Sequence, residues 1–266
     1  MITPRSSTLL ISTYNWPEAL ELVLLSIQKQ TQLPDEVIIA DDGSKQETTK
    51  LINKFKKDFG CPLIHVWHED KGFRKTLILN KAIAITSTDY IIQIDGDCIL
   101  HKDFIKDHIN NAEKNNYLYG SRVTLKKELL PGIFDKKTTY FDFFSKGIKK
   151  RARTIRISLF TKLYKPKSEL SRKLRGCNLS YWREDFISVN GYNEDMTGWG
   201  REDSELVARM LNKGLKGKRL KFGGIMYHIY HPEKPKDRLN INDEIQQKSI
   251  AEKQIWCAKG IDNYLK

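Results

Sequence analysis

Two carboxylates lie two residues apart at the end of an apolar segment. Asp95 and Asp97 flank Gly96 and directly follow the apolar run at 90–94. A buried strand does not keep ionised carboxylates in its interior, so both groups belong where the strand ends. Carboxylate oxygens are preferred ligands of hard divalent cations, and two at this spacing can converge on one ion. Because Asp and Gly also form ordinary turns, the motif alone does not establish a metal site.

Two further acidic segments change that balance. A second apolar run at 36–40 leads into D-D-G-S at 41–44, and G-W-G-R-E-D at 198–203 joins a turn to an expected helix. Acids at two strand ends and at one helix start together predict a site for a metal ion, a diphosphate and a general base.

The first half of the chain alternates strands with helices. We expect strands at 8–13, 36–40, 63–67 and 90–94, and helices from Pro17 to about Ile27, at 48–58 and at 75–85. This alternation predicts βαβ units and a largely parallel sheet. Ligands of such sheets bind outside the carboxyl ends of the strands, which is where Asp42 and Asp97 lie.

The alternation stops after Val123. Residues 124–173 are interpreted as loop-like and basic, with aromatic residues at Tyr140, Phe141, Phe143 and Phe144. We expect a strand-like run at 176–182, a short helix at 184–189, a helix at 202–212, a strand at 225–231 and a helix from Asn242, its possible cap, to about Lys259. The predicted organisation is one structural domain with three parts: a donor half at 1–123, a basic variable segment at 124–175 and an acceptor half at 176–266.

Positive charge is concentrated in one segment. The 266-residue chain carries a net charge of +13, and 145–175 holds twelve Lys and Arg residues against one acid, Glu169, a net of +11. Such a block suits an anionic partner, namely nucleic acid, acidic lipid or a phosphate-bearing substrate. A solvated loop kept soluble by its charge is the simpler alternative.

The chain shows no sign of export or of a membrane span. No run of about 18 apolar residues occurs, and no basic segment followed by an apolar stretch opens the sequence. The four cysteines are scattered without a C-x-x-C pair, which favours reduced thiols over a disulfide framework. These features lead us to expect a cytoplasmic protein.

The motifs, taken in order, resemble those of the inverting, metal-dependent glycosyltransferases of GT-A family 2. They are T-Y-N at 13–15, D-D-G-S at 41–44, E-D-K-G-F-R at 69–74 and D-G-D at 95–97. G-C-N-L-S-Y-W-R at 176–183, with 198–203, is similar to the carboxy-terminal region of galactosyl- and N-acetylgalactosaminyl-transferases, among them chondroitin-type polymerases and β-1,4-galactosyltransferases. The resemblance covers about 7–123 and 174–235. It implies an α/β GT-A (Rossmann-like) fold with a central mixed, mostly parallel sheet flanked by helices.

On the donor side, the resemblance implies a role for each of three aspartates. Asp42 would accept from the uracil ring N–H, and Asp95 would face the ribose or a metal-bound water. Asp97 would bind Mn²⁺ or Mg²⁺, which neutralises the diphosphate leaving group. Further donor contacts are implied for Thr13, Tyr14, Asn15, Arg74 and Gly96, with Lys75 adding charge.

On the acceptor side, the resemblance implies that Asp203 is the general base. An Asp with its ordinary pKa is ionised at pH 7, so no tuning of Asp203 is expected. Glu202 is the second candidate and an acceptor ligand. Trp199 would offer its face to a sugar ring, with Gly200 and Asn178 as further acceptor contacts. The alternative is that both acids only complement the positive end of a helix.

The resemblance implies that one histidine after the last core strand completes the metal site. His228 and His231 are three residues apart, so in a regular strand they point to opposite faces and cannot easily share one ion. We favour His228, with His231 as second choice. In one place the sequence departs from the family pattern, because Leu79 stands where an arginine often precedes the asparagine that matches Asn80. The donor contact usually made by that arginine is therefore missing or comes from another residue.

The resemblance implies transfer of a hexose, Gal or GalNAc, from a UDP-sugar, with UDP-Glc or UDP-GlcNAc as the alternative. The expected acceptor is a lipid-linked saccharide in surface-polysaccharide synthesis. The basic segment, with the aromatic residues before it, predicts peripheral attachment to the inner face of the cell membrane.

Three other functions were weighed against glycosyl transfer. A glycosidase also needs two carboxylates but neither a metal nor the D-D-G-S strand end. A basic nucleic-acid-binding protein would use the +11 segment, but it leaves the acidic motifs unexplained. A nucleotidyltransferase would need a Gly-rich phosphate loop, which the chain lacks.

Overall fold

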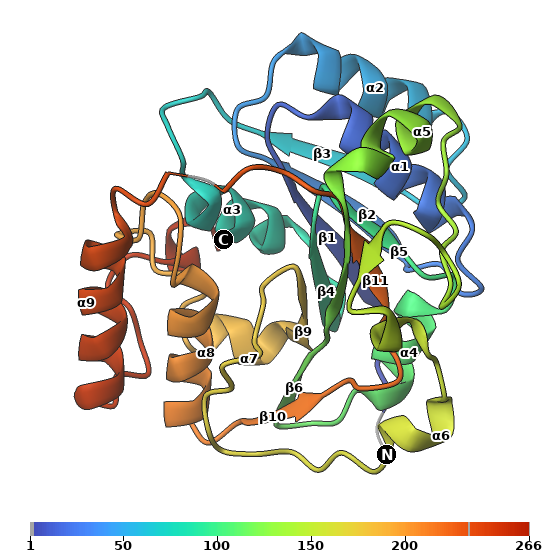
Figure 1. Cartoon of the computed structure of the whole chain (residues 1–266). Coiled ribbons are helices and arrows are strands. Elements are labelled where there is room, and N and C mark those ends of the chain that lie inside the picture. The colour runs from blue at the N-terminus through green and yellow to red at the C-terminus, as the bar shows by residue number, and fades with distance from the viewer. Residues whose placement is uncertain (1–2, 234, 266) are drawn as a thin grey trace.

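The computed structural model describes residues 3–233 and 235–265, and it contains one large sheet between two layers of helices (Figure 1). The strand order of this seven-stranded sheet is β10-β6-β9-β4-β1-β2-β3. Its parallel part consists of β1 (Ser7–Thr13), β2 (Glu36–Asp41), β3 (Leu63–Trp67) and β4 (Tyr90–Asp95). These strands confirm the predicted βαβ half, because β-branched apolar runs buried on both faces suit a parallel sheet.

The second half of the chain completes the same sheet. β9 (Asn178–Trp182) runs antiparallel between β4 and β6 (Asn116–Tyr119), and β10 (Lys216–Arg219) pairs parallel with β6. The sheet is therefore mixed and mostly parallel, as the sequence predicted.

Helices cover both faces of the sheet. One core contains side chains of α1 (Pro17–Gln28), α2 (Gln46–Lys56) and α4 (Phe104–Asn111). The other contains side chains of α3 (Lys75–Ile85), α7 (Arg183–Ile187) and α8 (Glu202–Asn212). This two-sided cover leaves the carboxyl ends of β1, β2 and β4 as the edge where a ligand can bind.

A smaller sheet stands beside the first. Its four strands, in the order β5-β11-β7-β8, are β5 (Cys98–Leu100), β11 (Met226–His228), β7 (Arg122–Leu125) and β8 (Ile148–Lys149). β5 follows Asp97 directly, and β11 lies beside it in antiparallel pairing. The second sheet thus brings the end of β11 to the D-G-D turn.

The segment 124–173 is more ordered than the predicted loop. It contains α5 (Leu130–Asp135), α6 (Ser158–Thr161), β8 and two short 3₁₀ helices, Lys127–Leu129 and Arg151–Thr154. Phe141 and Ile148 are buried in a third core with residues of α1 and β11. Isolated apolar residues in a polar sequence carried no periodic signal, but they suffice to dock the segment.

The carboxy-terminal helix differs from its predicted bounds. α9 spans Leu239–Ala251, so it starts before Asn242 and ends well before Lys259, ahead of a 3₁₀ helix at Ile261–Tyr264. Asn242 is buried inside the helix rather than capping it. Its side-chain amide donates to the carbonyls of Thr197 and Gly200, because those carbonyls lie in a turn packed against α9.

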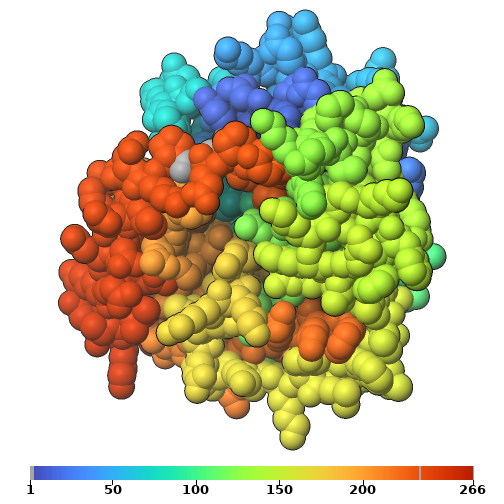
Figure 2. Space-filling model, in the orientation of Figure 1, coloured from blue at the N-terminus to red at the C-terminus, as the bar shows by residue number. Residues whose placement is uncertain are grey.

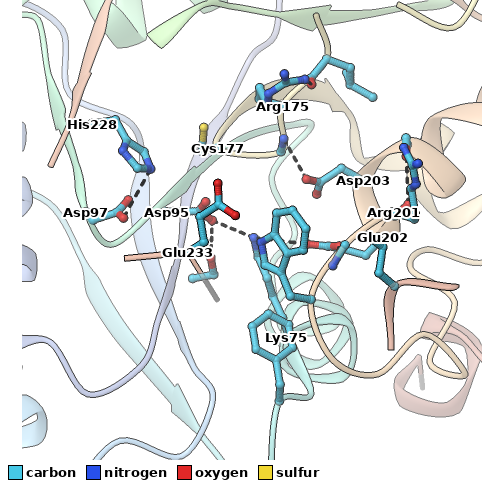
Figure 3. A pocket seen from close by; sticks show the side chains of 18 of the residues that line it. Lys75, Asp95, Asp97, Arg175, Cys177, Arg201, Glu202, Asp203, His228 and Glu233 are labelled. Atoms are coloured by element: carbon cyan, nitrogen blue, oxygen red, sulfur yellow. Dashed lines mark hydrogen bonds and ion pairs between the residues drawn. The ribbon is translucent and has the colours of Figure 1, made fainter. Parts of the chain in front are cut away.

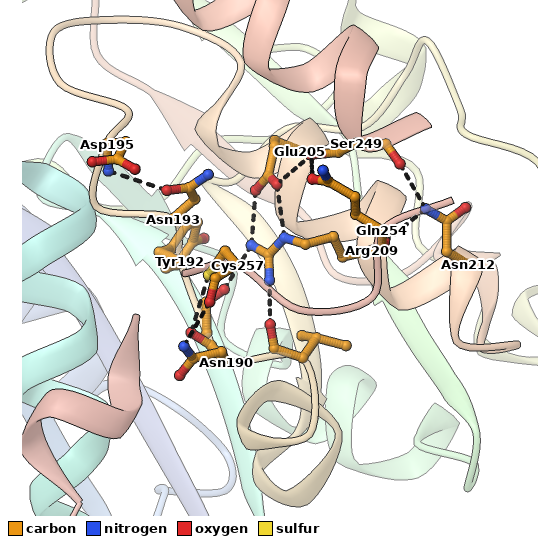
Figure 4. Close-up of polar contacts among 12 residues, drawn as sticks. Asn190, Tyr192, Asn193, Asp195, Glu205, Arg209, Asn212, Ser249, Gln254 and Cys257 are labelled. Atoms are coloured by element: carbon orange, nitrogen blue, oxygen red, sulfur yellow. Dashed lines mark hydrogen bonds and ion pairs between the residues drawn. The ribbon is translucent and has the colours of Figure 1, made fainter. Parts of the chain in front are cut away.

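A buried ion pair fixes α8 against α9 (Figure 4). The Arg209 Nε donates to Glu205 at 2.7 Å, and both side chains are fully buried. The Ser249 hydroxyl of α9 donates to the same carboxylate at 2.9 Å, and Arg209 also donates to the carbonyl of Gly191. Because every charge has a partner, this network orients α8 and hence the acids at its start.

Candidate active site

A deep cleft opens at the carboxyl ends of the central strands (Figure 2). Its volume is about 1310 Å³, and both Asp97 and Asp203 line it, as do Asp42, Asp95, Trp199 and Glu202. The hollow is bordered by the basic segment and by the chain that follows β11. The acids predicted from three separate motifs therefore share one cavity.

Asp97 lies within reach of two histidines. Its Oδ2 is 3.5 Å from the Nε2 of His228 and 3.3 Å from the Nε2 of His231, and ligand atoms of all three residues lie within 4.8 Å of one another. The prediction that the two histidines point apart is wrong, because β11 ends at His228 instead of reaching residue 231. The Ile229 N–H donates to the carbonyl of Asp97 at 2.9 Å, which ties the chain after β11 to the D-G-D turn.

This donor set fits a divalent transition-metal ion. One carboxylate and two imidazoles suit Mn²⁺ better than Mg²⁺, which prefers oxygen ligands and retained waters. Burial lowers the pKa of His228, although Asp97 opposes that effect. A neutral imidazole is the form that binds a metal ion.

Asp95 forms an ion pair with Lys75 (Figure 3). The Lys75 ammonium donates to the Asp95 Oδ1 at 2.8 Å, and the Ser12 hydroxyl donates to the same oxygen at 2.7 Å. Burial raises the pKa of Asp95, but Lys75, Ser12 and His228 together lower it below its ordinary value. Asp95 is thus ionised and fixed.

Lys75 also faces the acids at the start of α8. Its ammonium lies 3.9 Å from the Glu202 Oε1. Burial lowers the pKa of Lys75, but Asp95, Asp203 and Glu202 raise it well above its ordinary value. Lys75 therefore stays positively charged. It lies between Asp95 at the end of β4 and Glu202 at the start of α8, and so links the two sides of the cleft.

Glu202 and Asp203 are buried acids with raised pKa values. Burial and the negative charge of Asp203 raise the pKa of Glu202 to about 7, against the attraction of Lys75. Burial also raises the pKa of Asp203, which Lys75 partly offsets. The prediction that Asp203 has an ordinary pKa is therefore wrong, because sequence gives no measure of desolvation.

Two hydrogen-bond donors fix the Asp203 carboxylate. The Gly176 N–H donates to Oδ2 at 2.9 Å, and the Tyr192 hydroxyl donates to Oδ1 at 3.2 Å. A Cβ atom at Gly176 would lie 1.9 Å from Oδ1, so this backbone position excludes every other residue. The close approach explains why a glycine precedes Cys177 at the end of the basic segment.

The acid at the end of β2 is held by its neighbours. The Asp42 Oδ1 is 2.7 Å from the Nε2 of His68, and its Oδ2 accepts from the backbone N–H of Arg74 at 2.9 Å. Burial raises the pKa of Asp42, with His68 and Arg74 opposing it. Asp41 instead accepts from the Ser44 N–H and shapes the turn.

The T-Y-N segment lies at the same end of the sheet, where Thr13 and Tyr14 line the cleft. The Tyr14 hydroxyl donates to Asp70 at 2.8 Å, and Asn15, with a φ of +47°, accepts from the Lys45 N–H. Gly96 packs against Thr13, whose Oγ1 would lie 2.8 Å from an added Cβ atom. The Arg74 guanidinium donates to the Glu69 carbonyl, so it braces its own loop.

The G-W-G turn requires backbone that favours glycine. Gly198 and Gly200 have φ values of +75° and +110°, and Arg201 has +73°. Trp199 projects from this turn with 40% of its surface exposed, under the ammonium of Lys236. The Gly200 N–H donates to Glu202, so turn and acid are oriented together.

Asn178 does not reach the cleft, unlike the other predicted acceptor residues. It is fully buried, with its amide donating to the carbonyls of Ser121 and Gly224. Its Oδ1 lies 3.1 Å from the Nε2 of His108. Because these contacts use both ends of the amide, the structure gives Asn178 a place in the interior.

Sequence reasoning missed two residues that orient the acids. His68 holds Asp42, and Tyr192 holds Asp203. His68 follows β3, whose carboxyl end neighbours that of β2, so the parallel order could have indicated it. No local signal marked Tyr192, which is fully buried among aromatic residues.

Comparisons with known proteins agree with this geometry. The family model described as glycosyl transferase family 2 matches residues 8–164, and one described as the N-terminal domain of galactosyltransferase matches 156–232. The chain is 22% identical over 268 residues to chondroitin synthase from Escherichia coli, covering 92% of this chain and 37% of that protein. It spans about a third of the length of the curated relatives it matches.

Solved glycosyltransferases share the fold. TarS residues 1–349 from S. aureus, in complex with UDP, superpose with a TM-score of 0.61 at 15% identity, covering 97% of this chain and 68% of that one. The mannosyltransferase PcManGT from Pyrobaculum calidifontis, in complex with GDP-Man and Mn²⁺, gives 0.59 at 17% identity, covering 91% and 61%. With the first family model matching more than half of the chain, this protein belongs to glycosyl transferase family 2.

Proposed function

We propose that this glycosyltransferase moves a hexose from a UDP-sugar to a saccharide hydroxyl, with inversion and with a divalent metal ion. One observation carries the proposal: Asp97 with its two histidines and the Glu202–Asp203 pair line one cleft, in which Lys75 lies between Asp95 and Glu202. A donor's diphosphate and an acceptor's hydroxyl need groups of these two kinds on opposite sides of the anomeric carbon.

In the proposed reaction Asp203 takes the proton of the acceptor hydroxyl. The hydroxyl oxygen forms a bond to the anomeric carbon while the bond from that carbon to the diphosphate oxygen breaks, so UDP leaves and the configuration inverts. Asp203 suits this role because two donors fix its carboxylate and burial raises its pKa toward the working range. Glu202 is the second candidate and an acceptor ligand.

The proposed donor site lies at the ends of β1, β2 and β4. Asp42 keeps lone pairs for the uracil N–H, and Asp95 faces the ribose. Thr13, Tyr14 and Gly96 line the site, and Asn15 and Arg74, which do not line the cleft themselves, are proposed as further donor contacts. Asp97, His228 and His231 would hold Mn²⁺, which supplies charge neutralisation to the diphosphate. This is consistent with 1–123 as a donor half and 176–266 as an acceptor half joined by 124–175.

The donor sugar is proposed to be Gal or GalNAc, with Glc or GlcNAc as the alternative. The match to the galactosyltransferase model over 156–232 supports the first pair. Trp199 and Gly200, beside Glu202, would bind the acceptor sugar ring. The similarity to chondroitin synthase supports a role in polysaccharide synthesis. We propose that the acceptor is a lipid-linked saccharide.

Screening donor hydrolysis tests the reaction. UDP-Gal, UDP-GalNAc, UDP-Glc, UDP-GlcNAc and GDP-mannose are incubated with the protein, and release of UDP or GDP is measured with Mn²⁺, with Mg²⁺ and with EDTA. We expect release from UDP-Gal or UDP-GalNAc, faster with Mn²⁺ than with Mg²⁺, and none with EDTA. Turnover of GDP-mannose alone, or undiminished activity in EDTA, would contradict the proposal.

We further propose peripheral attachment to the cytoplasmic face of a membrane. Among the residues described, none of the helices has the length and apolar composition needed to cross a bilayer. Two exposed apolar surfaces instead flank basic side chains: Tyr140 with Phe144, and Leu159 with Leu163 at α6. Phe141 of the predicted aromatic cluster is excluded, because it is buried. Each basic residue near an anionic leaflet contributes about 1 kcal/mol.

Liposome co-sedimentation tests the attachment. We expect binding to vesicles with 30% phosphatidylglycerol that falls at least about tenfold in 0.5 M NaCl, because surface charges are screened. Phe144→Ser/Leu163→Ser should weaken it, whereas Trp256→Ser, which removes an exposed aromatic residue outside both surfaces, should not. Equal binding to neutral vesicles, or none at low salt, would contradict it.

A further inference from the structure

Five cations gather beside the cleft. Arg122 begins β7, Arg219 ends β10, and Lys150, Arg153 and Arg175 come from the basic segment. Arg122 and Arg175 line the cleft itself. The Arg153 guanidinium donates to the Arg122 carbonyl, and the Arg219 guanidinium donates to the hydroxyl of Ser121, the residue before Arg122. Burial lowers the pKa of Arg153, and the nearby charges of Arg219, Arg122 and Arg175 add to this effect.

No carboxylate balances this group, which we name the cation cluster (Arg122, Lys150, Arg153, Arg175 and Arg219). Within residues 3–233 and 235–265 none of the five forms an ion pair, whereas nearby Arg156 pairs with Asp107 and Lys218 pairs with Glu113. Their hydrogen bonds go to neutral oxygens, such as Arg153 to the Arg122 carbonyl at 2.9 Å. The Arg219 Nε is buried without any partner.

Gathering like charges in a partly buried place costs free energy, and an anion bound there would recover it. Guanidinium groups match the oxygens of phosphate and carboxylate with paired hydrogen bonds. The cluster therefore has the chemistry of an oxyanion site that holds about two negative charges or more.

The cluster lies on the acceptor side of the cleft. Arg219 is on β10, at the edge of the sheet opposite β3, whereas Thr13, Asp42 and Asp95 belong to β1, β2 and β4. Arg175 directly precedes Gly176, whose N–H fixes Asp203. In the view of Figure 3, Arg175 and Lys75 lie on opposite sides of Asp203. An anion here would neighbour the proposed base rather than the uracil end.

We propose that the cation cluster binds an oxyanion carried by the saccharide acceptor, a phosphate or diphosphate in first place, and so selects acidic acceptors. The inference rests on the proposed glycosyl transfer and adds the class of acceptor to it. It also gives the cations of the basic segment two roles. Those that line the cleft would bind the acceptor, and those that face outward would contact a membrane surface.

Binding of matched sugars tests the cluster with the full chain. N-acetylglucosamine 1-phosphate and N-acetylglucosamine are titrated calorimetrically, with UDP and Mn²⁺ saturating the donor site. We expect the phosphorylated sugar to bind at least about tenfold more tightly. Arg122→Gln/Arg175→Gln should remove this preference, whereas Lys54→Gln/Lys57→Gln, which removes two exposed charges of α2 and its end, should keep it.

Further arms separate the sources of the anion. Glucuronic acid against its methyl ester reports on a carboxylate, and vesicles containing phosphatidylglycerol report on a lipid headgroup. Equal binding of charged and neutral sugars would overturn the proposal. A loss of UDP affinity in Arg122→Gln/Arg175→Gln would also overturn it, because the cluster would then belong to the donor site. The same holds if this variant loses only vesicle binding, because the cluster would then bind lipid headgroups. These experiments measure binding and not turnover. If the donor screen fails, the same sugars can therefore be titrated without UDP, and the preference for the phosphorylated sugar still tests the cation cluster.

Discussion

Asp203→Asn is expected to lower kcat for transfer by about 10²–10⁴-fold while the Kd for UDP changes less than about threefold. The substitution keeps the size of the side chain and removes its capacity to take a proton. Tyr192 can reverse its hydrogen bond to accept from the new amide, so the fold has no reason to change. The measurements are kcat with the best donor of the screen and UDP affinity by calorimetry.

Glu202→Gln is the matched control for the base. If Asp203 is the base, Glu202→Gln should reduce kcat less and should mainly raise KM for the acceptor. Near-normal kcat in Asp203→Asn together with a collapse in Glu202→Gln would move the role to Glu202. Loss of UDP binding in Asp203→Asn would mean that the residue supports the fold instead.

The pH profile gives the same prediction an independent readout. Burial and Asp203 raise the pKa of Glu202 to about 7, so the pair loses its protons over a range that includes neutral pH. The ionised form is the active one, and kcat/KM should therefore rise with pH through about 7 and then level off. In Glu202→Gln the limb should move to lower pH, because Asp203 loses a negative neighbour. A profile flat from pH 5 to 8 would contradict this assignment.

Asp97→Asn is expected to weaken Mn²⁺ binding by at least about 10²-fold and to lower metal-dependent turnover by a similar factor. The reason is that Asp97 contributes the only negative charge of its cluster with His228 and His231. Mn²⁺ binding is measured from the paramagnetic resonance of the free ion, and turnover from UDP release.

Changes to the two histidines complete this test. His228→Ala and His231→Ala should each weaken Mn²⁺ binding about tenfold or more, because both imidazoles lie within 3.5 Å of Asp97. His101→Gln, outside the cleft, is the control. If only His228→Ala weakens Mn²⁺ binding, His231 is not a ligand. Unchanged Mn²⁺ binding in Asp97→Asn would contradict a metal site at these three residues.

The sequence by itself determined the parallel half of the fold and the end of the sheet that carries the site. Apolar runs such as 36–40 and 90–94 are local and periodic, and parallel strands necessarily bring their carboxyl ends to one edge. Asp42 and Asp97 could therefore be placed together before any contact was known. The acidic start of α8 was equally local, since the turn glycines and the acids mark it.

Only the tertiary structure decided which groups meet and how they ionise. The early end of β11 turns both His228 and His231 to Asp97, and packing buries Asn178 away from the cleft. Burial, not residue type, raises the pKa values of Glu202 and Asp203, and it depends on chain segments far apart in sequence. The basic segment shows the same limit: its composition gave its charge, but only the fold shows that Arg172 and Arg175 line the cleft. Contacts between distant segments have no local signal, because a periodic pattern records only which face is buried and not against what.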